Sequence, residues 1–163
     1  MRLPKNMTAF SKKYKLGHHL LPLLGTWLDI KHFGLIREAL LDDEEVAIAF
    51  EGRFQPANSI QAQAGKENKD KVKWRTTKGY YAFAVTNRQR LIYAHWRPFH
   101  HTVESIRFDR MTDVKIATGV FMGRTRVGTL EDDFYIYFFS GTIKRIGKIL
   151  QTAAIEKRVV DMI

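Results

Sequence analysis

The stretch AFAVTNRQRLIYAH, residues 82–95, places the polar residues TNRQR between two apolar runs that each have the length of a strand. Asn87 suits a tight turn, because asparagine tolerates left-handed backbone and its side chain bonds to backbone groups nearby. Two such runs separated by a few polar residues are typical of a β-hairpin. The stretch therefore predicts two adjacent antiparallel strands, with Arg88 and Gln89 exposed at the bend and Arg90 at the start of the second strand.

The same pattern continues outward along the chain. Upstream of the turn, Tyr81, Phe83 and Val85 alternate with other residues, as in a strand with one buried face. Downstream, GVFMG and EDD are turn-like links between further strand-like runs. The chain therefore predicts seven antiparallel strands, at residues 46–54, 79–86, 90–96, 102–108, 113–119, 124–130 and 134–139.

A helix is predicted on either side of these strands. Phe33, Ile36 and Leu40 recur at helical spacing, and the acidic cluster at residues 42–45 ends that helix before the first strand. After the last strand, the apolar period changes to that of a closing helix over residues 140–163. One apolar face of this closing helix is formed by Ile143, Ile146, Leu150, Ala153 and Val160.

The order of these elements predicts an α+β, mainly β fold. Residues 1–32 form a basic N-terminal helical leader, and residues 33–163 form one domain. Successive strands with short turns favour a barrel or a sandwich, in which the last helix covers an open end or edge. Residues 55–78 are polar and without periodicity, so they predict a long loop.

Composition restricts the classes of function. The formal net charge of +10 favours anionic partners such as nucleic acid, acidic protein or anionic lipid. The chain has no cysteine, which excludes disulfides, thiolate metal sites and thiol catalysis. The most apolar segment, residues 20–30, is too short for a membrane span, which needs about 20 apolar residues. The cytoplasm is the expected location, with a peripheral position at the inner face of the membrane as the alternative.

Four local sequences, LLDDEEV, AFAVTNRQRLIYA, GVFMG and FYIYFF, together resemble the bacterial pleckstrin-homology-like (PH-like) domains, and the YokE-like group in particular. AFAVTNRQRLIYA looks like that group's strand–Thr-Asn-x-x-Arg-Leu–strand hairpin, and GVFMG is similar to its apolar turn between glycines. The resemblance runs from about residue 33 to residue 160 and depends on the order of the motifs. It implies a partly open seven-stranded antiparallel barrel that is capped by the C-terminal helix.

The resemblance also implies a kind of function. It implies no catalysis, and several bacterial PH-like domains assemble as homo-oligomers. The wider superfamily binds phosphoinositides, peptides or partner proteins. Because function varies so much on this fold, the transfer is by analogy.

No catalytic or metal site is predicted. Carboxylates cluster at residues 42–45 and 131–133, but both clusters lie at element junctions, where acidic residues serve turns. The adjacent histidine pairs at 18–19 and 100–101 are poor chelates, since neighbours in a strand point to opposite faces, and loop positions are expected for them. The chain has no nucleophile elbow, phosphate-binding loop or dinucleotide fingerprint, so neither an enzyme nor a cofactor is predicted.

The apolar turn between Gly119 and Gly123 is the candidate protein contact. Its three residues are Val120, Phe121 and Met122, and an exposed apolar tip often marks a contact surface. The alternative is that the turn folds back onto its own barrel or onto the leader.

Two basic segments are candidates for binding anions or lipid. In the PH superfamily, basic residues around the first long hairpin loop often hold phosphoinositide head groups, and the resemblance places part of the loop at 55–78 near that position. The candidate anion- or lipid-binding residues are Lys12, Lys13 and Lys15 in the leader, and Lys71, Lys73, Arg75 and Lys78 in the loop. The candidate membrane-interface residues are Leu20, Leu21, Leu23, Leu24 and Trp27.

The favoured interpretation is a non-catalytic PH-like binding module that acts through protein contacts, with a protein partner or a second copy of itself. The alternative is a peripheral binder of anionic membrane surfaces, in which the basic leader meets lipid head groups. A second alternative, less favoured, is non-specific nucleic-acid binding through the same charges.

Overall fold

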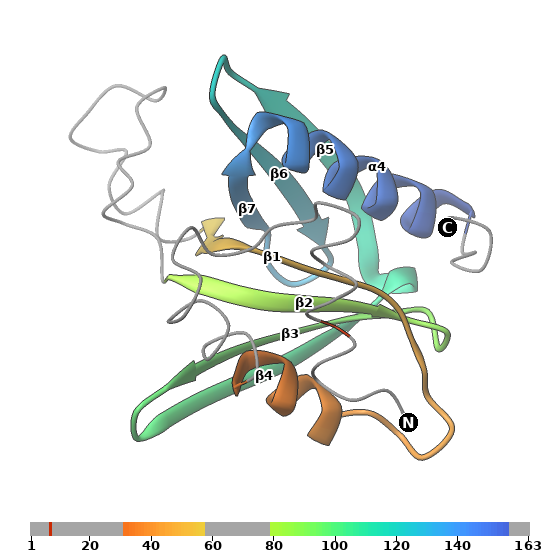
Figure 1. Cartoon of the computed structure of the whole chain (residues 1–163). Helices are drawn as coiled ribbons and strands as arrows, with labels where there is room; N and C mark the ends of the chain where they lie inside the picture. Colours follow the sequence, from red (N-terminus) through yellow and green to blue (C-terminus); the bar gives the residue numbers. More distant parts are fainter. Residues whose placement is uncertain (1–6, 8–30, 58–78, 157–163) are drawn as a thin grey trace.

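The structure is a computed structural model that describes Met7, residues 31–57 and residues 79–156. The described residues form a helix at 31–38, an antiparallel sheet and a C-terminal helix (Figure 1), which confirms the prediction of a mainly β, α+β chain. The strands are β1 (Val46–Pro56), β2 (Tyr80–Thr86), β3 (Arg90–Arg97), β4 (His100–Arg107), β5 (Met111–Thr118), β6 (Met122–Thr129) and β7 (Phe134–Phe139). The other two elements are the 3-10 helix η2 (Phe108–Arg110) and the helix α4 (Ser140–Glu156).

The seven strands form one sheet in the order β4-β3-β2-β1-β7-β6-β5. Each neighbouring pair is antiparallel. β4 and β5 are joined directly by η2, yet they lie at opposite edges of the sheet and do not pair with each other. The sheet is therefore open, and α4 packs across its β5, β6 and β7 side.

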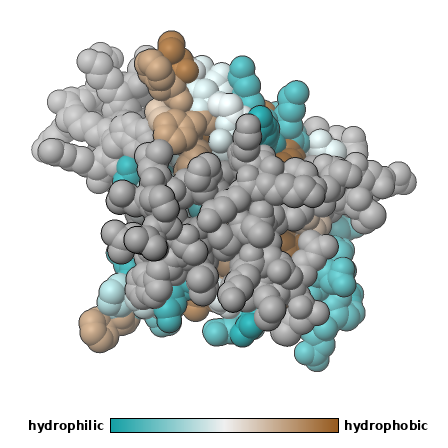
Figure 2. Space-filling model, in the orientation of Figure 1, coloured by the Kyte–Doolittle hydropathy of each residue, from teal (hydrophilic) through white to brown (hydrophobic). Residues whose placement is uncertain are grey.

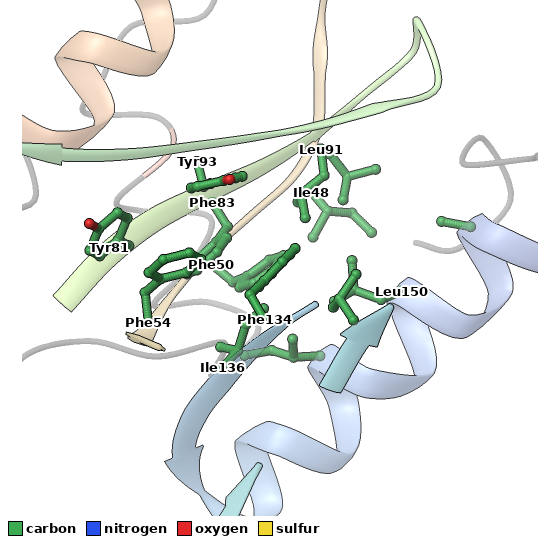
Figure 3. Close-up of a cluster of buried hydrophobic side chains, with 14 of the residues drawn as sticks. Ile48, Phe50, Phe54, Tyr81, Phe83, Leu91, Tyr93, Phe134, Ile136 and Leu150 are labelled. Carbon is green, nitrogen blue, oxygen red and sulfur yellow. The ribbon is translucent and has the colours of Figure 1, made fainter. Parts of the chain in front are cut away.

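The central strands are buried on both faces of the sheet. In β2, Tyr81, Phe83 and Val85 point to one core, while Ala82 and Ala84 belong to a second core on the other face. The first core is rich in aromatic rings, and Figure 3 shows it together with Leu150 from α4. The predicted apolar face of α4 is confirmed for its four described members, Ile143, Ile146, Leu150 and Ala153, which have no exposed surface.

The second core lies under the helix at 31–38. Its sheet side is made largely of alanines, at positions 49, 82, 84 and 94, and small side chains let a helix approach a sheet closely. Phe33 and Ile36 fill the space from the helix side, and Met7 joins them with only 1% of its surface exposed. The β1–β2 register is irregular between Val46 and Ile48, so Val46 packs in the second core and Ile48 in the first.

Several strand boundaries differ from the prediction by one or two residues, and two of them are informative. β1 continues to Pro56, two residues into the segment that the sequence predicts as a loop. β4 begins at His100, because Phe99 takes a left-handed conformation (φ 68°) and closes a two-residue turn after Arg97. The expectation of loop positions for the histidines at 100–101 is therefore wrong: they are exposed strand residues that pair with β3.

Candidate protein-contact site

The turn between β5 and β6, which we call the tip, presents two apolar side chains to solvent. Val120 is 88% exposed and Phe121 is 78% exposed, whereas Met122 is half-buried and begins β6. Phe139, at the end of β7, pairs with Met122 in the register and is 44% exposed. Figure 2 shows hydrophobic side chains gathered at the top of the molecule, where the β5–β6 hairpin ends.

Hydrogen bonds fix the backbone of the tip. The amide of Gly119 donates to the carbonyl of Met122 at 2.8 Å, which closes the turn. The amide of Ser140, the first residue of α4, donates to the carbonyl of Phe121 at 3.0 Å. The Ser140 hydroxyl donates to the carbonyl of Gly119 at 2.7 Å. The exposed side chains are therefore presented by a backbone that is tied to the start of α4, which lowers the entropy lost on binding.

The hairpin predicted from residues 82–95 forms, and Arg90 begins β3 as expected. Asn87 lies in the turn, as expected, and the left-handed residue of the bend is Gln89 (φ 54°). Asn87 accepts a hydrogen bond from the amide of Glu45 at 3.0 Å, far away in the sequence. Arg88 is at the exposed bend and forms an ion pair with Asp43.

A buried ion pair lies next to this bend, between Glu44 and Arg90. The Arg90 Nε donates to Glu44 Oε1 at 2.6 Å, and a second guanidinium nitrogen donates to Glu44 Oε2. The Thr86 hydroxyl adds a bond to Oε1 at 2.5 Å, and the amide of Leu41 adds one to Oε2 at 3.0 Å. Arg90 also donates to the carbonyl of Ala39 at 2.8 Å, so the pair joins the end of the helix at 31–38 to the β2–β3 hairpin.

The ionisation of Glu44 follows from these contacts. Burial by itself raises the pKa of this carboxyl, but the hydrogen bonds from Arg90, Thr86 and Leu41 and the Arg90 charge lower it below its ordinary value. A carboxylate held in this way is a weak base, and its role is to connect elements. The sequence indicated that residues 42–45 end a helix, but no local signal pairs Glu44 with a residue 46 positions later.

The buried histidine His95 is also structural. Its ring stacks with that of His32, at a centroid distance of 5.3 Å, and with that of Tyr81, at 4.5 Å. Its Nδ1 lies 2.6 Å from the carbonyl of Tyr80, so Nδ1 carries the proton, and its Nε2 accepts a bond from Arg97 at 2.6 Å. Burial lowers the pKa of His95, and the charges of Arg97 and His100 lower it further. Among the described residues, no three His, Asp or Glu side chains are grouped to hold a metal ion.

The other predicted site residues lie outside the described part of the chain. These are the anion- or lipid-binding candidates Lys12, Lys13, Lys15, Lys71, Lys73, Arg75 and Lys78, the interface candidates Leu20, Leu21, Leu23, Leu24 and Trp27, and Val160 of the closing helix. In the parts of the chain that the structure describes, no helix has the length and apolar character of a membrane span.

The tip is thus the one predicted contact site whose geometry the described residues provide. Comparison of the chain with protein-family models, with curated proteins and with solved structures gave no match. The resemblance to the PH-like group therefore stays a prediction.

Proposed function

We propose that the chain is a non-catalytic binding module of PH-like architecture, which acts through protein contacts and associates with itself. The observation that carries the proposal is the exposure of Val120 and Phe121 on a backbone fixed by hydrogen bonds. The PH-like part is supported by the open seven-stranded sheet and by the C-terminal helix across it, together with the resemblance in sequence.

The energetics favour the tip as a contact. Complete burial of one large apolar side chain contributes roughly 1.5–3 kcal/mol, so Val120 and Phe121 together supply about 3–6 kcal/mol. That is the size of a binding hot spot, in which a few residues contribute most of the affinity. The fixed backbone adds to this, since less freedom is lost on association.

The test is light scattering of the full chain across a concentration series, with the double variant Val120→Ser/Phe121→Ser. We expect the mass of the wild type to rise with concentration, and the variant to associate at least about tenfold more weakly, since about 1.4 kcal/mol is already a factor of ten. Phe99→Ser is the matched control, because Phe99 is also fully exposed but lies in the β3–β4 turn. A tip variant that associates like the wild type would contradict the proposal, and so would a wild type that stays monomeric.

The same proteins distinguish the alternative of an anionic membrane surface. Lys144, Arg145 and Lys148 are exposed on the first turns of α4, beside the tip, and carry the charge that anionic lipid attracts. Vesicles with and without anionic lipid are added, with single-stranded nucleic acid as competitor. If the wild type sediments with anionic vesicles, the tip variant does not, and the wild type does not self-associate, then the function is membrane binding and not protein contact. Nucleic acid that binds wild type and tip variant equally would favour the third interpretation.

A further inference from the structure

A pocket lies next to η2, which joins the two edge strands β4 and β5, and next to the β6–β7 turn. Its volume is 320 Å³, at the lower end of the range of about 300–1,000 Å³ for pockets that hold small ligands. Phe54, Tyr93 and Phe134 line it, and their ring centroids are 5.2, 5.3 and 5.6 Å apart in pairs. The three rings are largely buried and form an aromatic floor, on which an apolar side chain can pack.

The rim of this pocket is acidic. Its charged residues are four carboxylates, Glu104, Glu131, Asp132 and Asp133, and one guanidinium, Arg110. Two carboxylates already have partners, since Arg110 pairs with Glu131 at 2.6 Å and Arg126 pairs with Asp133. Leu130 also lines the pocket and is 71% exposed, so the rim presents both an apolar side chain and negative charge.

The tip has the opposite charge. The segments 116–125 and 136–154, which form the tip and the strands and helix around it, contain the four basic residues Arg124, Lys144, Arg145 and Lys148 and no acidic residue. Of these, Lys144, Arg145 and Lys148 are exposed on α4. Lys115 and Arg126, further from the tip, pair instead with Asp113 and Asp133 of the other end. From residue 108 to residue 155, the acidic residues are at 109, 113 and 131–133, at the end of the hairpin away from the tip. The molecule thus has a basic end with an apolar projection and an acidic end with an aromatic pocket.

The tip and the pocket of one chain cannot meet. The tip precedes the first residue of β6, whereas the pocket adjoins its last residue, Thr129. The eight residues of β6 separate the two ends by about 23 Å, at roughly 3.3 Å per residue. Any occupant of the pocket that resembles the tip must therefore come from another molecule.

We propose that the tip of one copy of this chain seats in the pocket of the next copy, so that the chain assembles head to tail. This inference rests on the self-association in the proposed function and names the surfaces that carry it. Phe121 enters the space above Phe54, Tyr93 and Phe134, and the basic residues of α4 face the acidic rim. A symmetric tip-to-tip contact would instead bring the same basic residues of two copies together, which is unfavourable.

Head-to-tail contacts leave one free tip and one free pocket at every stage, unless the assembly closes into a ring. This property gives a decisive test with two full-length variants. The tip variant is Val120→Ser/Phe121→Ser, and the pocket variant is Leu130→Lys/Glu131→Lys, whose two positions are exposed. Each variant alone is expected to be monomeric, with association weakened at least about tenfold.

An equal mixture of the two variants is expected to form a dimer and nothing larger. The intact tip of the pocket variant binds the intact pocket of the tip variant, and the remaining tip and pocket are both defective. Sedimentation velocity measures this mass. Glu38→Lys is the matched control for charge reversal, because Glu38 is exposed on the helix at 31–38. This variant is expected to assemble like the wild type. The mixed dimer should also weaken as salt rises from about 0.15 to 0.6 M, since the contact charges are screened.

The failures of the two proposals are distinguishable. If the wild type and the pocket variant both assemble while the tip variant does not, the proposed function stands and the pocket is not the partner of the tip. If both variants are monomeric and their mixture is too, the tip does not bind the pocket, and the head-to-tail inference is wrong. If the wild type itself does not assemble, both proposals fall together.

Discussion

Glu44 and Arg90 place opposite charges where water has little access. The Glu44 side chain has no exposed surface and that of Arg90 is 17% exposed, so water replaces neither when its partner is removed. Removing one partner of such a buried ion pair is strongly destabilising, although the intact pair contributes less to stability than its short distances suggest. The neighbouring pair of Asp43 and Arg88 is exposed on both sides and offers a direct comparison.

We expect Glu44→Gln to lower the free energy of unfolding by about 3 kcal/mol at neutral pH, because it leaves the Arg90 charge without its partner. Asp43→Asn should cost less than about 1 kcal/mol, as is usual for an exposed pair. Urea unfolding of the two variants measures both values. Equal losses would show that the Glu44 contacts do not connect the helix to the hairpin.

The same substitution should change the dependence of stability on acid. Folding lowers the pKa of Glu44, so its ionised form stabilises the fold above the ordinary value of 4.5, and that contribution is lost as the pH falls through the lowered value. The difference between wild type and Glu44→Gln should therefore become smaller as the pH is lowered below the ordinary value.

α4 lies close to the sheet at Gly147. A Cβ at this position would lie 2.4 Å from Cγ1 and 2.5 Å from Cδ1 of Ile116, and 3.1 Å from Oγ1 of Thr125. Ile116 is β-branched, so it cannot rotate away freely. By contrast, a Cβ at Gly141, in the first turn of the same helix, would meet nothing within 4 Å.

We therefore expect Gly147→Ala to destabilise the chain by about 1–2 kcal/mol, because overpacking against β5 outweighs the higher helix propensity of alanine. Gly141→Ala should be neutral or stabilising by up to about 1 kcal/mol, since only the propensity changes there. Thermal unfolding followed by circular dichroism compares the two. A stabilised Gly147→Ala variant would mean that α4 does not pack on Ile116 as described.

At the scale of elements, periodicity in the sequence was sufficient to predict a strand or helix whose pattern involves residues close together in the chain. The alternation in β2 and the apolar face of α4 follow from side chains that are two, three or four positions apart. The exposure of Val120 and Phe121 could be anticipated from the apolar turn between two glycines. The pairing of Glu44 with Arg90, and the meeting of Phe54, Tyr93 and Phe134 in one pocket, depend on how distant strands pair, which no local pattern encodes.

In the part of the chain that the structure describes, the two cores join the sheet, the helix at 31–38 and α4 into one unit of stability. Met7 belongs to the second core, with Phe33 and Ile36, although the sequence favoured a boundary between leader and domain after residue 32. A side chain from the N-terminal segment therefore contributes to the interior of the domain.

We expect Met7→Ala to lower the free energy of unfolding of the full chain by about 3 kcal/mol, because it leaves a cavity against Phe33 and Ile36. Leu41→Ala, at a residue that is 57% exposed, should change it by less than about 0.5 kcal/mol. Both are measured by denaturant unfolding. An unchanged midpoint for Met7→Ala would indicate that the leader is energetically separate from the sheet.

The unequal faces of β2 also have a consequence for how the chain finds its fold. A strand that pairs one residue out of register turns every side chain to the opposite face. Such an error would press Tyr81 and Phe83 toward the helix at 31–38, where Ala82 and Ala84 leave little depth, and would leave voids in the aromatic core. Neither core could then pack, so a hairpin in the wrong register would separate and pair again before the helices pack on the sheet. The alternation of large and small side chains thus lets the growing sheet correct its own pairing errors during folding.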